Sequence, residues 1–82
     1  MKYLVFQKED HIVGGEWIVR LLVTTLSPEG YIVPSNIRSG ETSLLAFDTE
    51  DEAREKIQAT RKWHAEQSPD IQPPEFSFVA LP

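Results

Sequence analysis

Residues Phe47 to His64 read FDTEDEAREKIQATRKWH, an apolar lead-in followed by the strongest helical pattern in the 82-residue chain. Thr49 is placed to cap this helix, and Glu52, three positions later, completes a capping box. The acidic first turn complements the positive end of the helix dipole. The side chains predicted to face a core are Ala53, Ile57, Thr60 and His64, with Trp63 at their flank.

Strand-forming composition is concentrated in three segments, Lys2 to Gln7, Glu16 to Leu26 and Glu75 to Leu81, which carry large apolar side chains on both faces. A sheet covered on one side alternates apolar and polar residues, whereas a sheet covered on both sides is apolar nearly throughout. A single helix can cover only one face of such a sheet. The sequence therefore predicts a second apolar face that something else must cover.

Shorter elements complete the predicted order. Ser27 to Gly30 has the residues of a β-turn, Tyr31 to Val33 returns antiparallel, and Leu44 to Phe47 is expected to form a short strand. Lys8 to Gly15, polar at first and ending in two glycines, is expected to be a long connection. We therefore predict one domain over residues 1–82 with a small α+β fold in the order β-β-β-(β)-α-β. It has a mostly antiparallel four- or five-stranded sheet and one amphipathic helix packed on one face. The last strand and the short strand before the helix are candidates for parallel pairing through a right-handed crossover.

Two explanations for the second apolar face stay open. In the first, the Pro-rich segment Ser68 to Pro74 and the Lys8 to Gly15 connection fold over it, or strong coiling half-closes the sheet. In the second, which we favour, the face packs against a protein partner, either a second copy in a homodimer or another protein. The residues predicted at this protein interface are Tyr3, Val5, Trp17, Val19, Leu21 and Tyr31.

Composition restricts the partners. Thirteen acidic and eight basic residues give a net charge of −5, which disfavours direct binding to nucleic acid or to anionic membranes. Cysteine is absent, no segment approaches the roughly 20 apolar residues of a membrane span, and the first residues do not resemble a signal peptide. We therefore expect a cytoplasmic protein with no membrane partner.

Patterns for catalysis and ligand binding are weak. His11 and His64 are the only imidazoles, the serines lie outside nucleophile-elbow motifs, and Gly14-Gly15 lacks the spacing of a phosphate-binding loop. The acidic run from Asp48 to Glu55 has no EF-hand spacing and suits a helix N-terminus. We therefore predict no catalytic residue, no metal, no cofactor and no enzymatic activity.

These features bear on three classes of function. A non-enzymatic interaction domain is favoured, because the second apolar face and the aromatic residues suit a protein interface. An acidic inhibitor of the phage or mobile-element type, which blocks a basic nucleic-acid-binding protein, is the alternative. Such mimicry needs acidic residues clustered without basic ones between them. In this chain the predicted helix also carries four basic residues, Arg54, Lys56, Arg61 and Lys62. A small hydrolase or isomerase would need a concave site near His11 or His64.

Overall fold

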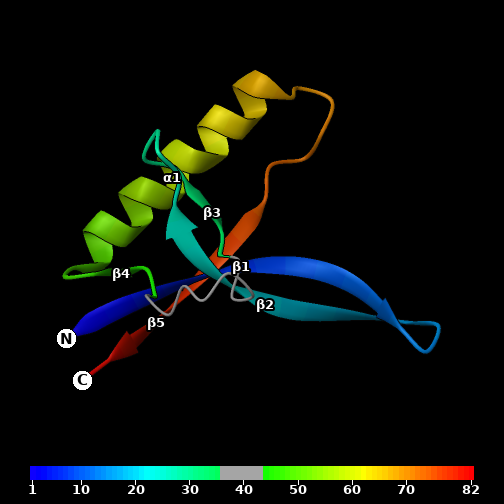
Figure 1. The fold of residues 1–82 in the computed structure, drawn as a ribbon, viewed down its shortest axis with the longest axis horizontal. Coiled ribbons are helices and arrows are strands. Elements are labelled where there is room, and N and C mark those ends of the chain that lie inside the picture. Colours follow the sequence, from blue (N-terminus) through cyan, green and yellow to red (C-terminus); the bar gives the residue numbers. More distant parts are fainter. Residues whose placement is uncertain (36–43) are drawn as a thin grey trace.

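The computed structural model describes residues 1–35 and 44–82, which form a curled antiparallel sheet with one helix lying across it (Figure 1). The strands are β1 (Lys2–Val13), β2 (Glu16–Leu26), β3 (Ile32–Pro34), β4 (Ala46–Phe47) and β5 (Glu75–Leu81), and the helix is α1 (Glu50–Gln67). This arrangement confirms the predicted fold class and the order of its elements.

β1 is the central strand of the sheet. It pairs antiparallel with β2, β4 and β5, and β3 extends the sheet from the far edge of β2. Tyr3 pairs with Phe47 of β4 and with Ala80 of β5, so these two strands lie on opposite edges of β1. The predicted parallel pairing of the last strand with the segment before the helix is therefore wrong.

The Lys8 to Gly15 segment is not the connection that the sequence predicts. β1 runs on to Val13, and Gly14 and Gly15 alone form the turn into β2. Both glycines have positive φ angles, 59° and 83°, as the two central residues of a type I′ hairpin turn require. The polar residues in this part of β1 are held in the strand by pairing with β2, which outweighs their weak preference for strands.

The outer part of the β1–β2 hairpin projects from the body of the protein as a two-stranded arm, residues 8–21 (Figure 1). β5 pairs with β1 only as far as Lys8, at the base of the arm, and β3 pairs with β2 only from Thr24 onward. In the part of the chain that the structure describes, neither edge of the arm beyond its base is paired with a third strand.

α1 begins as the sequence predicts. Thr49 is the N-cap, and its Oγ1 accepts a hydrogen bond from the backbone N–H of Glu52 at 3.1 Å. Arg54 forms an i, i+4 ion pair with Glu50 at 3.0 Å. Ala53 and Thr60, from the predicted inward stripe, are fully buried against the sheet.

The core lies between α1 and the sheet. Val5, Ile32 and Ala53 are its buried members, and half-buried side chains pack around them: Tyr3, Leu45, Phe47, Ile57, Phe76 and Phe78. Two buried threonines are satisfied within this core. Thr24 Oγ1 donates to the carbonyl of Val5 at 2.7 Å, and Thr60 Oγ1 accepts from the N–H of Ile32 at 3.0 Å. No helix among the described residues has both the length and the hydrophobicity to cross a membrane.

Candidate protein interface

The register of the sheet decides which side chains face α1. Residues directly opposite one another in an antiparallel pair share a face, and Phe6 pairs with Val23 of β2 and Ser77 of β5. The row of β1 that contains Val5 packs in the core under α1, so the alternate row faces away from the helix. We call that side the outer face. Its exposed large apolar side chains are Ile12, Trp17, Val19, Leu21, Val79 and Leu81.

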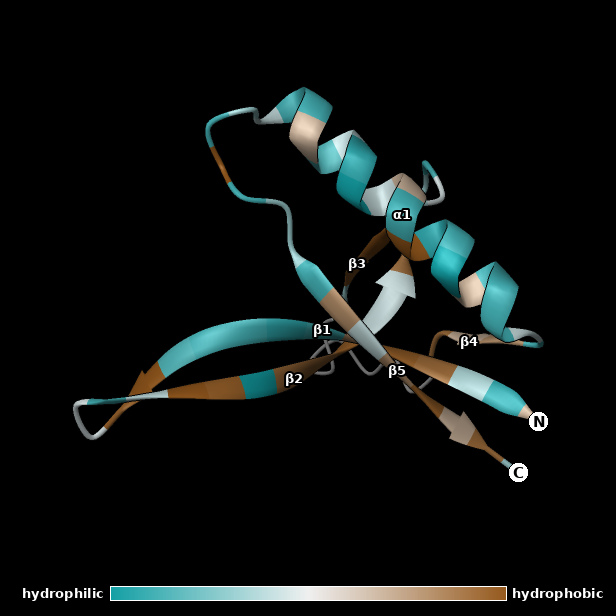
Figure 2. Cartoon of the chain, turned by 180° about the vertical axis from the view of Figure 1, so that it is seen from behind, coloured by the Kyte–Doolittle hydropathy of each residue, from teal (hydrophilic) through white to brown (hydrophobic). Residues whose placement is uncertain are grey.

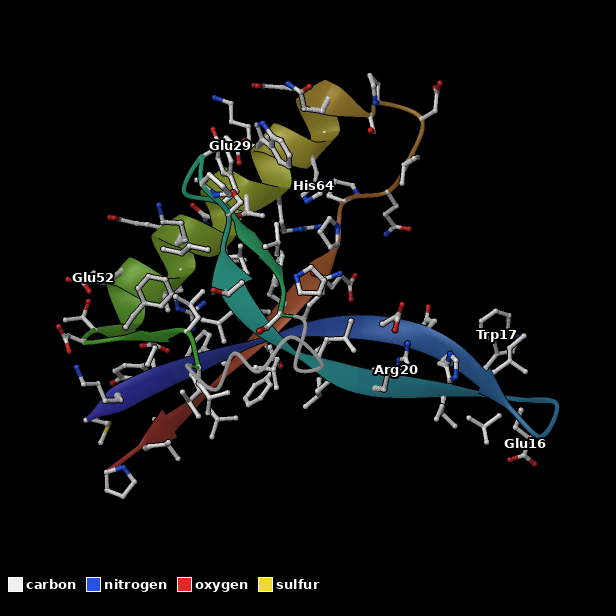
Figure 3. All side chains as sticks on the ribbon, in the orientation of Figure 1. Glu16, Trp17, Arg20, Glu29, Glu52 and His64 are labelled. Carbon is white, nitrogen blue, oxygen red and sulfur yellow. The ribbon has the colours of Figure 1, made fainter. Side chains whose placement is uncertain are left out.

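The arm carries the most exposed part of the outer face. Trp17 is 71% exposed, Val19 63% and Leu21 53%, values that are unusual for three neighbouring large apolar residues on one strand. Figure 2 shows β2 coloured as hydrophobic over most of the arm, with a hydrophilic interruption, while β1 is hydrophilic until it nears the tip. In Figure 3, Trp17 lies close to the tip of the arm, far from Glu52 and His64 on the helix.

The structure divides the six residues predicted at the interface into separate regions. Trp17, Val19 and Leu21 share the outer face of the arm. Val5 is 2% exposed and belongs to the core, and Tyr3 packs against that core, so the expectation that both lie on the uncovered face is corrected. Between Tyr3 and Phe6 both rows of β1 are apolar, and only the pairing with neighbouring strands determines which row faces α1.

Tyr31, the sixth predicted residue, lies on the helix side of the molecule. Its ring stacks on that of Trp63 in α1, with 4.8 Å between centroids and 15° between planes. This contact joins the loop before β3 to the helix and leaves Tyr31 half-buried. Tyr31 is therefore separated from the outer face by the sheet itself.

Three members of the outer face were not predicted at the interface. Ile12 pairs with Trp17 at the end of the arm, and Val79 and Leu81 extend the same face on β5. The Gly14-Gly15 pair, recognised as a two-residue hairpin turn, places Ile12 opposite Trp17 by counting outward from the turn. The position of Ile12 opposite Trp17 was therefore predictable from the sequence. The face of the sheet on which Val79 of β5 lies was not.

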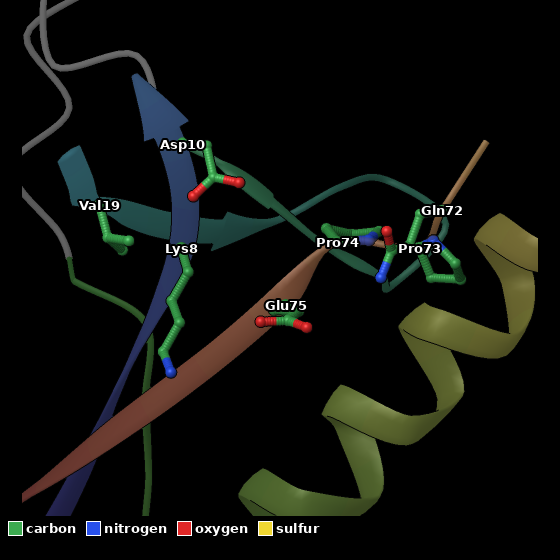
Figure 4. A pocket seen from close by; sticks show the side chains of 7 residues that line it. All are labelled: Lys8, Asp10, Val19, Gln72, Pro73, Pro74 and Glu75. Carbon is green, nitrogen blue, oxygen red and sulfur yellow. The ribbon is translucent and has the colours of Figure 1, made fainter. Parts of the chain in front are cut away.

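Charged side chains accompany the apolar row. On the outer face Asp10 pairs with Val19, and Lys8 pairs with Leu21. Lys8, Asp10 and Val19 line a hollow of about 350 Å³ at the base of the arm (Figure 4), together with residues 72–75, which lead into β5. Its lining therefore combines one cation, two carboxylates, including that of Glu75, and the rings of two prolines.

The described residues bring no groups together for metal binding. No cluster of three or more histidine, aspartate or glutamate side chains suited to a metal ion is found among them. His11 pairs with Ile18 on the arm, whereas His64 lies on α1 against the ring of Trp63. The two imidazoles thus belong to different parts of the molecule.

One ion pair lies at the other end of β1 from the arm. Lys2 donates a hydrogen bond to the carboxylate of Asp48, just before α1. This hydrogen bond, aided by the attraction of the ammonium group, lowers the pKa of Asp48 below its ordinary value. Both side chains are exposed, and the pair joins the start of β1 to the segment before the helix.

The comparisons identify no relative. No protein-family model matches this chain, and no curated protein or solved structure is significantly similar to it.

Proposed function

We propose that this protein is a non-enzymatic interaction domain that associates with a second copy of itself through the outer face of the sheet and arm. The observation that carries the proposal is the exposure of Trp17, Val19 and Leu21 on a projecting two-stranded arm. An isolated two-stranded hairpin is marginally stable in water and needs a third strand or another layer to pack against. A partner on the outer face supplies that layer.

The size of the apolar surface suits a dimer. The six exposed apolar side chains of the outer face present on the order of 500 Å², taking about 200 Å² for a fully exposed tryptophan and about 150 Å² for an aliphatic residue. A standard interface buries about 800 Å² on each partner, of which roughly 60% is apolar, or about 500 Å². The outer face therefore has the apolar area that one stable interface requires.

Charge supports a second copy as the occupant. Lys8 and Asp10 are two positions apart on the same face of one strand, with opposite charges. A two-fold axis passing between two facing copies brings Lys8 of each near Asp10 of the other, as the self-complementary contact of a symmetric dimer requires. The hollow at the base of the arm gives Trp17 of the second copy a site with proline rings and carboxylate acceptors for its indole N–H.

Sedimentation equilibrium tests the proposal. We expect a species of twice the 9.4 kDa chain mass at tens of micromolar protein, with dissociation on dilution. Hydrogen exchange on the same samples should show the amides of residues 9–20 more protected at high than at low protein concentration. A 9.4 kDa species at every concentration, or concentration-dependent protection confined to residues outside the sheet, would contradict self-association through this face.

The alternative proposal, an acidic inhibitor of a basic nucleic-acid-binding protein, makes a different prediction about salt. Charge mimicry weakens steeply as ionic strength rises, because exposed charges are screened. Association through the apolar outer face changes little over the same range. A salt series on whichever complex forms therefore separates the two functions.

A further inference from the structure

A second surface of the protein lies between α1 and β5, on the helix side of the sheet. It is a groove of about 450 Å³, and its lining includes Arg54, Ile57, Arg61, Phe76, Ser77 and Phe78. The helix supplies the two arginines and the isoleucine, and β5 supplies the two aromatic rings. This groove shares no lining residue with the hollow at the base of the arm.

One wall of the groove is an unpaired strand edge. β5 pairs with β1, and within residues 1–35 and 44–82 no strand pairs with its other edge. Phe76 and Phe78 point to one face of β5, and Ser77 between them points to the other. Because all three residues line the groove, the β5 backbone itself forms part of its wall. Alternate N–H and C=O groups of β5 point away from β1 along this edge and are able to pair with an added strand.

The two arginines are held at the groove by contacts with the protein. The guanidinium of Arg54 lies over the ring of Phe78, 5.1 Å from its centroid, and Arg61 Nε donates to the carbonyl of Pro74 at 3.2 Å. Each guanidinium has further N–H donors beyond these contacts. The two arginines are seven residues apart on α1, which separates their backbone positions by about 10 Å along the helix axis.

These observations fit an extended acidic ligand. We propose that the groove between α1 and β5 binds an acidic segment of another protein, which adds as a strand to the free edge of β5. Its carboxylates, two or four positions apart and therefore on one face of the added strand, face Arg54 and Arg61, since about 3.3 Å per residue along a strand lets that spacing match the two guanidiniums. The residues that alternate with them point to the opposite face of the added strand. Strand addition supplies affinity through main-chain hydrogen bonds, and the arginines supply the preference for acidic sequence.

Charge argues for this class of ligand over a basic or neutral one. The protein carries net charge −5, so an acidic segment is repelled from most of its surface and is attracted where two guanidiniums converge on one groove. Glu50, which pairs with Arg54, is 48% exposed at its side chain, so the ion pair is open to competition from a ligand carboxylate. When an acidic ligand binds, a ligand carboxylate therefore replaces that of Glu50 at Arg54, and a second ligand carboxylate pairs with Arg61.

The test uses a fluorescein-labelled peptide, Ser-Glu-Val-Glu-Val-Glu-Val-Ser, titrated with the full chain and followed by fluorescence anisotropy. The lysine version of the peptide, with every glutamate replaced, is the control ligand. Arg54→Gln with Arg61→Gln removes two positive charges from the groove, and Lys56→Gln with Lys62→Gln removes two from the same helix away from it. We expect the arginine pair of substitutions to weaken binding about tenfold and the lysine pair less than about twofold.

A second readout locates the bound peptide. Amide chemical shifts of β5 should change on titration, and exchange of its outward-pointing amides should slow as they become hydrogen-bonded. Absence of binding, equal binding of the lysine peptide, an equal loss in both double variants, or shift changes confined to the arm would each overturn the proposal. Trp17→Ala should bind the glutamate peptide as the parent does, so the groove is tested separately from self-association.

Discussion

Replacement of Trp17 by alanine tests the proposed dimer most directly. Trp17 is 71% exposed, which leaves about 150 Å² of its side chain available to a partner. At about 25 cal/mol per Å², complete burial of that area corresponds to about 4 kcal/mol, and truncation of an aromatic residue that anchors an interface costs about 2 kcal/mol or more. A symmetric dimer contains the residue twice, so the loss is at least about 4 kcal/mol, or roughly a thousandfold in Kd.

The assay is sedimentation equilibrium of the parent chain and of Trp17→Ala over the same range of protein concentration. Ile71→Ala is the matched control, because Ile71 is 68% exposed but lies in the segment between α1 and β5, away from the outer face. Thermal unfolding monitored by circular dichroism at low concentration, where the parent is monomeric, should change little for either variant, since both side chains are exposed. An unchanged dimer Kd for Trp17→Ala, or an equal weakening by Ile71→Ala, would refute the assignment of the interface to the outer face.

Three further predictions concern the fold. Thr60→Val leaves a buried β3 amide without its acceptor and should lower the free energy of unfolding by about 1–3 kcal/mol in urea titrations, whereas Thr60→Ser, which keeps the hydroxyl, should lose less; equal losses would contradict this role. Deletion of residues 68–82 removes β5 and two aromatic side chains from the core, so cooperative melting should disappear, and its retention would show that β5 is dispensable. Lys2→Met should return the pKa of Asp48 toward its ordinary value in an NMR titration. Because the folded-state pKa is depressed, the pair stabilises the fold above the unfolded pKa of Asp48, and this stabilisation is lost as pH falls through the folded-state pKa. If the pKa of Asp48 in Lys2→Met equals that in the parent chain, the ion pair is not the cause of the depression.

Elements whose cause is local in sequence were predictable. The start of α1 follows from a cap and an acidic first turn within a few residues of each other, and the structure has Thr49 at the predicted N-cap. β2 and β5 have the predicted bounds because aromatic and β-branched residues fill both segments. In these elements local preference and tertiary packing agree, and the sequence pattern alone is sufficient.

The length of β1 and the assignment of its faces were not predictable in the same way. The polar residues that follow Gln7 have little preference for strands, and they become part of β1 only because β2 lies beside them. Tyr3 and Leu4 are both apolar, so alternation cannot tell which of them faces the helix, and a shift of one residue in register would exchange the two rows. Register is a property of pairs of distant segments, and the choice of interface residues depended on it.

The composition of the arm also bears on how the proposed dimer exists in solution. On its outer face, the cross-strand pairs Asp10–Val19 and Lys8–Leu21 each set a charged side chain of β1 beside an apolar side chain of β2. An arm whose outer face was apolar along the whole of both strands would expose a broad patch and would aggregate through that face. With Lys8 and Asp10 on β1, the apolar surface narrows to a stripe along β2, and the free chain can stay in solution. A second copy can then cover this stripe while Lys8 and Asp10 of each copy face one another across the two-fold axis, an arrangement suited to reversible association.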